Sequence, residues 1–216
     1  MAGSVAGAGP GQPQVSTGWH HFGASDNTPA AEPSESGVWR HFGTTAVVPK
    51  AVAPNPGPHE SVPARSALEI ADLEKQMYEL VNRDRSDPAN AGEIGGKVTP
   101  LKWNERLASV ARAHSRAMLT QGFFAHVDPE GRSPGMRVRA AGIGWQAVGE
   151  NIAIYPSVES AETAFMNEPR FEHNHRSNIL GSKYTDVGVG IVQDPRGWYY
   201  ITEEFLQKPI DLRASF

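Results

Sequence analysis

Large aliphatic side chains are missing from the first third of this chain, and this constrains its fold more than any other feature. No Leu or Ile precedes Leu68, and nine of the 17 prolines lie before Ala64. A segment so poor in aliphatic residues cannot bury enough apolar surface to offset the entropy lost when it is ordered. We therefore expect residues 1–64 to form a long extended N-terminal arm and residues 65–216 to form the folded domain.

The arm contains one short aromatic motif twice. Gly18–Gly23 reads GWHHFG and Val38–Gly43 reads VWRHFG, so the pattern W-x-H-F-G recurs after twenty residues. Large rings of this kind can fill pockets on a partner protein. The residues that we expect to bind a partner are Trp19, His21, Phe22, Trp39, His41 and Phe42. Two alternatives stay open: the rings could pack on the chain's own domain, or the two histidines could bind a metal or a pigment.

Composition excludes several classes of function. The net charge of −4 and the pI of about 6.1 give no basic surplus, so we expect no nucleic-acid partner. The absence of cysteine rules out disulfides and cysteine-based metal sites. No apolar run approaches the roughly 20 residues that span a bilayer, so we expect no transmembrane segment. The N-terminus shows neither the charged region nor the apolar region of a recognisable secretion signal.

Cap and breaker residues divide the domain into helices followed by strands. They predict four helices, which run from Ser66 to Arg85, Asn104 to Gly122, Ser133 to Gly142 and Ser157 to Asn167. Short apolar or alternating stretches predict strands at Asn151–Tyr155, Val187–Val192 and Trp198–Phe205, the last two joined as a hairpin. Helices first and an antiparallel hairpin last indicate an α+β fold, with helices packed on a small sheet.

Titratable side chains lie at the edges of several predicted elements, beside apolar neighbours. The four that stand out are His126, Glu150, Glu168 and His175. Imidazole and carboxylate groups together can bind a divalent cation or relay protons. Each of these residues alone is more often a structural hydrogen-bonding group, so only their combination suggests a catalytic or metal site.

The order of these motifs resembles the CAP superfamily of cysteine-rich secretory, antigen 5 and pathogenesis-related 1 proteins, in particular its cysteine-free bacterial branch. The resemblance runs from about Ser66 to Phe205. It rests mainly on the stretches Val81–Arg83, Leu101–Asn104, Phe124–His126, Gly149–Ala153, His175–Leu180 and Val187–Gly190. It implies a three-layer α-β-α sandwich whose cavity carries two histidines and two glutamates.

The same resemblance assigns roles to individual residues. By the family pattern, His126 and His175 are the cavity histidines, and Glu150 is the glutamate of the Gly-Glu-Asn motif. The second glutamate is Glu168, which follows Phe165 where the family has tryptophan, and Glu172 is the alternative. The two histidines can hold a zinc-like ion, with the glutamates orienting water. Since two protein ligands make a weak site, we expect no required cofactor and an optional metal.

Two functions are compatible with this sequence. The first is a non-catalytic binding or scaffold protein, docked through its arm as an accessory subunit of a larger assembly, with a small hydrophobic ligand or lipid as a further partner. The second is a hydrolase in which His126 or His175 acts as base, or a metal-bound water as nucleophile. Ser133 and Ser177 are imaginable nucleophiles, but neither lies in a G-x-S-x-G elbow. The resemblance implies an extracellular, periplasmic or cell-surface location.

Overall fold

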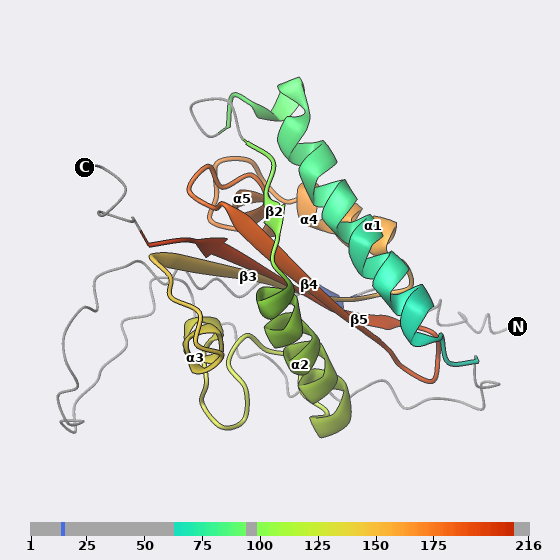
Figure 1. The fold of residues 1–216 in the computed structure, drawn as a ribbon. Coiled ribbons are helices and arrows are strands. Elements are labelled where there is room, and N and C mark those ends of the chain that lie inside the picture. Colours follow the sequence, from blue (N-terminus) through green and yellow to red (C-terminus); the bar gives the residue numbers. More distant parts are fainter. Residues whose placement is uncertain (1–13, 16–62, 94–98, 210–216) are drawn as a thin grey trace, which may run out of the picture.

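The computed structural model describes residues 14–15, 63–93 and 99–209, which are arranged in three layers around one sheet (Figure 1). The elements are β1 (Gln14–Val15), α1 (Ala67–Ser86), η1 (Pro88–Asn90), β2 (Lys102–Trp103), α2 (Glu105–Gln121), α3 (Pro134–Ala140), β3 (Ala147–Tyr155), α4 (Val158–Met166), α5 (His175–Ile179), β4 (Asp186–Gln193) and β5 (Tyr199–Gln207). Helices α2 and α3 cover one face of the sheet, and α1, α4 and α5 cover the other. The expected α+β, three-layer α-β-α sandwich is thus confirmed.

The strand order in the described residues is β1-β3-β5-β4-β2. Strand β3 pairs antiparallel with β5 along its whole length, and β5 pairs antiparallel with β4 as the predicted hairpin. Strand β2 lies parallel to β4. Strand β1 belongs to the predicted arm and pairs antiparallel with Ala153 and Ile154 of β3, a contact that the sequence did not predict. Both aromatic motifs of the arm lie outside the described residues.

Most helix boundaries follow the cap residues seen in the sequence. The Ser66 side chain accepts a hydrogen bond from the Glu69 N–H and completes a capping box at the start of α1. Helix α2 ends at Gly122, whose φ of 69° is the left-handed conformation that glycine adopts without a steric penalty. Helix α3 starts as predicted, after Ser133, but ends two residues before Gly142.

Three elements differ from the sequence prediction. Strand β3 begins at Ala147 rather than Asn151, because its first residues pair with the end of β5 despite the polar Gly149-Glu150 interruption. The two-residue strand β2 lies in a stretch for which the sequence predicted no element. Helix α5 has five residues and is therefore too short for apolar periodicity to reveal it.

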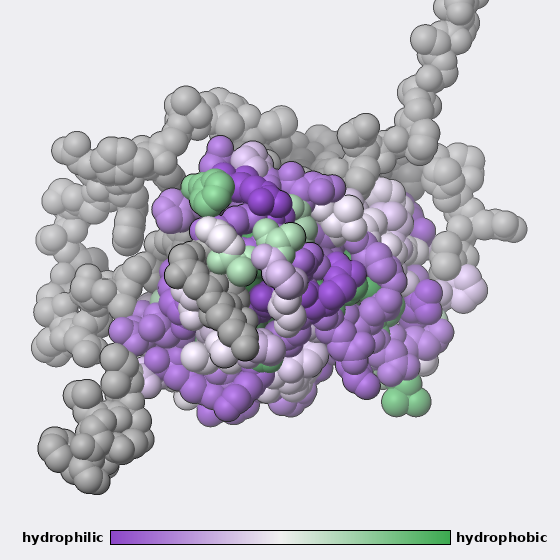
Figure 2. All heavy atoms as spheres, turned by 90° about the horizontal axis from the view of Figure 1, so that it is seen from above, coloured by the Kyte–Doolittle hydropathy of each residue, from purple (hydrophilic) through white to green (hydrophobic). Residues whose placement is uncertain are grey.

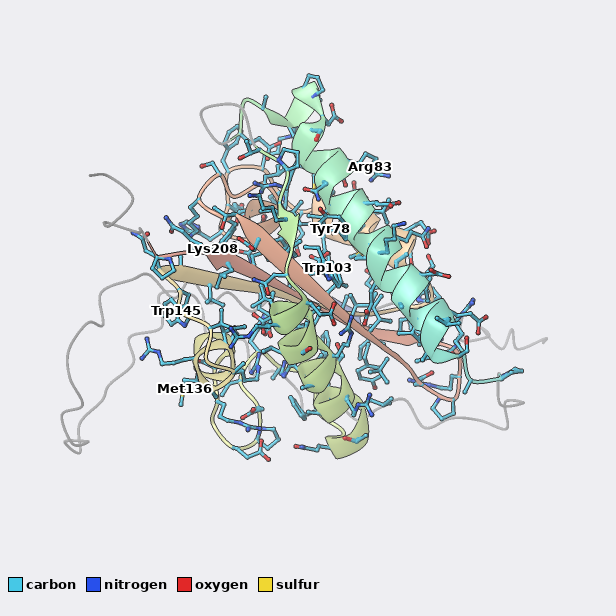
Figure 3. All side chains as sticks on the ribbon, viewed as in Figure 1. Tyr78, Arg83, Trp103, Met136, Trp145 and Lys208 are labelled. Carbon is cyan, nitrogen blue, oxygen red and sulfur yellow. The ribbon has the colours of Figure 1, made fainter. Side chains whose placement is uncertain are left out.

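Alternating side chains of the strands form two cores, one on each face of the sheet. On the face of α1 and α4, Ile201 and Phe205 of β5 are fully buried. Figure 3 shows Tyr78 of α1 beside Trp103 of β2, where the two rings meet edge to face at 5.7 Å. On the opposite face, Ser115 of α2 hydrogen-bonds to Thr202 at 2.8 Å, so each helix layer is tied to β5.

Candidate functional site

The four predicted site residues form two histidine–glutamate pairs beside β3. Nδ1 of His126, in the loop between α2 and α3, lies 2.8 Å from Oε1 of Glu150 on β3. Nδ1 of His175, the first residue of α5, lies 2.6 Å from Oε1 of Glu168, and its backbone N–H donates to Oε2 of the same carboxylate. Both histidines are buried, with exposed fractions of 5% and 2%.

The two pairs come from opposite helix layers and meet. The ring centroids of His126 and His175 are 6.4 Å apart, and the ring planes are inclined by 33°. The ring of Phe165 lies 4.7 Å from that of His175, at the position where the family pattern has tryptophan. The alternative glutamate, Glu172, is exposed and lines a separate surface hollow, so Glu168 is the residue in contact with His175.

The carboxylates determine which ring nitrogen carries the proton. An ionised carboxylate can only accept a hydrogen bond, so beside such a carboxylate Nδ1 of the histidine donates, and Nε2 of the neutral ring carries the lone pair. Histidines that bind metals commonly have this arrangement, with the second ring nitrogen donating to a carboxylate. Zinc–nitrogen bonds of about 2 Å place the centroids of two ligating rings about 5–6 Å apart, compared with 6.4 Å between these two rings.

The possible metal site has few protein ligands. Across the described ranges, no three His, Cys, Asp or Glu side chains are grouped so that they could hold an ion. An ion between His126 and His175 would therefore depend on water for its remaining ligands. Because structural zinc normally has four protein ligands and catalytic zinc three, such a site binds weakly.

A buried charge cluster supports Glu150 on the side away from His175. Nη2 of Arg137, on α3, donates to Oε2 of Glu150 and lies 3.7 Å from Oε1 of Glu204. Glu150 and Glu204 are direct partners in the pairing of β3 with β5. Burial raises the pKa of Glu150, although Arg137 opposes the shift, and burial raises the pKa of Glu204 well above its ordinary value. One guanidinium thus faces two carboxyl groups, and burial favours the neutral form of Glu204.

A third histidine, His114 of α2, borders the same cluster. Its Nε2 lies 3.1 Å from the Ala125 carbonyl and 3.8 Å from Oε2 of Glu150. Burial, assisted by the positive charge of Arg137, lowers the pKa of His114 to about 3, so its ring is neutral at physiological pH. The sequence pattern did not single out His114 as a site residue.

Asparagine side chains fix α5 against β3. Nδ2 of Asn151 donates to the His175 carbonyl at 3.2 Å and to Oε2 of Glu203 at 2.9 Å. Nδ2 of Asn178 donates to the Glu150 carbonyl and to Oδ1 of Asn151. The asparagine of the Gly-Glu-Asn motif therefore holds the backbone that carries His175.

The two serines considered as nucleophiles have structural contacts. Ser133 Oγ accepts from the Met136 N–H at the start of α3. Ser177 Oγ donates to the Asn174 carbonyl and accepts from the Asn174 N–H at the start of α5. A serine nucleophile needs an adjacent base, and these hydroxyls are helix caps.

Comparison with known proteins identifies relatives for most of the domain. The profile of the cysteine-rich secretory protein family (CAP) matches residues 78–205, more than half of the chain. The sequence is 32% identical to Bacillus subtilis YkwD over 140 residues, which cover 64% of this chain and 49% of YkwD. It is 29% identical to the B. subtilis membrane protein YlbC over 136 residues, which cover 62% of this chain and 34% of YlbC. The chain thus spans about half or less of these curated relatives.

Solved structures share the fold. An extracellular protein with an SCP domain from Bacillus anthracis is 27% identical with a TM-score of 0.55, over 68% of this chain and 45% of that one. An outer surface protein of Borrelia burgdorferi has a TM-score of 0.56 at 14% identity, over 68% of this chain and 98% of that one. In the described part of this chain, no helix is both long enough and apolar enough to cross a membrane.

Proposed function

The chain belongs to the cysteine-rich secretory protein (CAP) family, and we propose that within it this protein is a non-catalytic binding module. The observation that carries the proposal is the pairing of His126 with Glu150 and of His175 with Glu168, in rings 6.4 Å apart. Two imidazoles whose orientation is fixed by carboxylates suit the capture of a ligand. Ser133 and Ser177, the two serines considered as nucleophiles, make helix-capping contacts instead.

The ligand of this site is a weakly bound divalent cation of the zinc type. His126 and His175 would hold it through Nε2, while Glu150 and Glu168 hold the rings through Nδ1. The bound ion would supply a Lewis-acidic contact for a further small ligand. Since the protein offers two ligands, occupancy depends on the free metal concentration.

Thermal unfolding in the presence of zinc tests this function. Zinc should raise the melting temperature of the wild type and should not raise that of His126→Ala/His175→Ala, because an ion stabilises only the state that binds it. The matched control is His173→Ala, a change at an exposed histidine two residues from His175. Equal shifts in the wild type and the double variant would remove the metal site from this account.

The arm supplies the second part of the proposed function, docking onto a larger assembly as an accessory subunit. The support is the repeated W-x-H-F-G motif, which is set in a stretch without large aliphatic residues. Trp19→Ala/Trp39→Ala should release a partner that co-purifies with the wild type, while Pro54→Ala/Pro56→Ala should retain it. A lower melting temperature of the tryptophan variant alone would instead indicate rings packed on the chain's own domain.

The location that we propose is extracellular, periplasmic or at the cell surface. The support is the similarity to the extracellular SCP-domain protein of Bacillus anthracis. Fractionation of the native cells, with detection of the full chain, tests this location. Recovery of the protein in the cytoplasmic fraction alone would contradict it.

Hydrolysis is the second candidate, and the buried acid groups beside His126 favour it. Burial raises the pKa of Glu150 and of Glu204, which would suit one of them to donate a proton. A screen of ester, amide and phosphoester substrates decides between the two functions. Turnover that His175→Ala abolishes would replace the binding module with an enzyme.

A further inference from the structure

A buried arginine connects His126 to the rest of the domain, and we propose that Arg137 is the positioning residue for this half of the site. Its side chain is 8% exposed, and it enters from α3, an element outside the histidine–glutamate pattern of the sequence. The inference rests on the proposed function, because it concerns how His126 is held ready for a ligand.

The hydrogen bonds of Arg137 form a closed network with His126 and Glu150. Nη1 donates to the carbonyls of His126 and Arg132, at 2.8 and 2.9 Å, and so fixes the backbone of the loop. Nη2 donates to Oε2 of Glu150, whose other oxygen accepts from Nδ1 of His126. One guanidinium therefore holds both the main chain of His126 and the carboxylate that orients its ring.

Only a guanidinium has the geometry for this task. Its planar fork presents several N–H donors in fixed directions, whereas a lysine ammonium is a single point charge. The positive charge is balanced at close range by Glu150, and the second carboxyl, Glu204, lies 3.7 Å away. A lysine at position 137 keeps the charge balance but cannot reach the loop carbonyls and Glu150 together.

Neighbouring arginines do not share this role. Arg132 is 51% exposed and pairs with Asp128 in its own loop. Arg139 extends over the Trp145 ring, at 5.2 Å from its centroid. Figure 3 shows Trp145 beside α3, next to Met136 and at the end of the sheet. Arg132 and Arg139 provide matched controls, because they are arginines within five positions of Arg137.

The test compares Arg137→Lys with Arg132→Lys in the full chain. Imidazole nitrogen NMR reads the tautomer of His126, and a chelator competition reads the affinity for zinc. Arg137→Lys should give a mixture of tautomers and weaken zinc binding about tenfold or more, as expected when a side chain that supports a metal ligand is lost. Arg132→Lys should keep the Nδ1–H tautomer and bind zinc within about twofold of the wild type.

The outcomes separate this inference from the proposed function. A folded Arg137→Lys protein with the wild-type tautomer of His126 and the wild-type zinc affinity would overturn the positioning role of Arg137. If the wild type binds no zinc, the metal site of the proposed function fails, while the tautomer still reports on Arg137.

The wild type provides a variant-free test if Arg137→Lys does not fold. If this hydrogen-bond network is present, the Arg137 guanidinium should rotate slowly and give separate NMR signals for its two Nη groups. The Arg139 guanidinium, which serves as the control, should rotate fast. Fast rotation of the Arg137 guanidinium would show that its Nη groups are not held by these hydrogen bonds, and would overturn the inference.

Discussion

Two carboxyl groups are buried on the face of the sheet that α1 and α4 cover, and they make the stability of this protein depend on pH. Glu203 of β5 is fully buried, and Glu162 of α4 is 1% exposed. Burial raises the pKa of Glu203 to about 8, although the Asn151 side chain opposes the shift. Burial and then the charge of Glu203 raise the pKa of Glu162 well above its ordinary value. At neutral pH Glu203 therefore keeps its proton in the folded state, and the raised pKa of Glu162 acts in the same direction.

We predict that the wild type loses stability between pH 6.5 and pH 8. The unfolded chain releases these protons near pH 4.5, whereas the folded Glu203 keeps its proton up to about pH 8. The contribution is therefore complete below pH 4.5 and is lost as the pH rises through 8. The window avoids the opposite effect of His114, whose lowered pKa acts below pH 6.5.

The substitution Glu203→Gln should reduce this slope, since one of the buried carboxyl groups with a raised pKa no longer titrates, while Glu150, Glu162 and Glu204 still do. Thermal unfolding at several pH values gives the measurement, and the exposed Glu130→Gln serves as control. An unchanged slope in Glu203→Gln would show that Glu203 is ionised in the folded protein.

Residues of the candidate site differ in how far the sequence could reveal them. His126, Glu150, Glu168 and His175 were identified by a family pattern, because their spacing along the chain is specific. Arg137, Glu204 and His114 were not, because their roles depend on which strands and helices become neighbours. The alternation along β5 does place Glu204 on one face with Thr202, but the register with Glu150 is a tertiary property.

At the scale of elements, the close approach of α2 to β4 depends on two glycines. A Cβ at Gly188 would overlap the backbone of Leu107 and Ala108, and a Cβ at Gly190 would overlap that of Ala111 and Arg112. A glycine inside a strand often marks such a contact with another backbone. The Val-Gly-Val-Gly repeat of β4 therefore lets α2 lie directly on the sheet.

We predict that Gly190→Ala destabilises the domain by about 2 kcal/mol or more, because the helix backbone cannot yield as a side chain would. Denaturant unfolding measures the loss. The control is Gly92→Ala, where an added Cβ meets nothing within 4 Å. Similar stability of the two variants would mean that α2 and β4 are further apart than the structure indicates.

Helices were easier to predict from the sequence than strands. Ser66, Asn104 and Ser157 each accept a hydrogen bond from the first turn of a helix, so the start signal is local. Strand β2 has no comparable signal, and the capping box at Asn174 of α5 precedes only five helical residues. Both are short, and their place is fixed by contacts with distant residues, such as the buried Arg85 that donates to the Ile179 carbonyl at 2.6 Å.

At the scale of the whole molecule, one face of the domain can be compared with the contribution of the arm. Seen from above, the face in Figure 2 is mainly hydrophilic, with apolar side chains in small separate groups. The arm contributes to the described fold only through β1, which pairs with two residues of β3. The core clusters of the described residues are formed mainly by α1, α2 and the sheet.

We predict that deletion of residues 1–60 leaves the domain folded, with a loss of about 1 kcal/mol or less, since the pairing that it removes among the described residues is one two-residue strand. Circular dichroism and thermal unfolding of the shortened chain give the measurement. A shortened chain that does not fold would contradict the division between arm and domain.

The central claim at this scale is that two helix layers bring His126 and His175 together into one ligand site. The most direct measurement is a zinc titration of the wild type, followed through the imidazole NMR signals of both histidines. One equivalent of zinc should shift the Nε2 signals of His126 and His175 together, with the same apparent Kd. A response of one histidine alone, or of neither, would contradict a shared site.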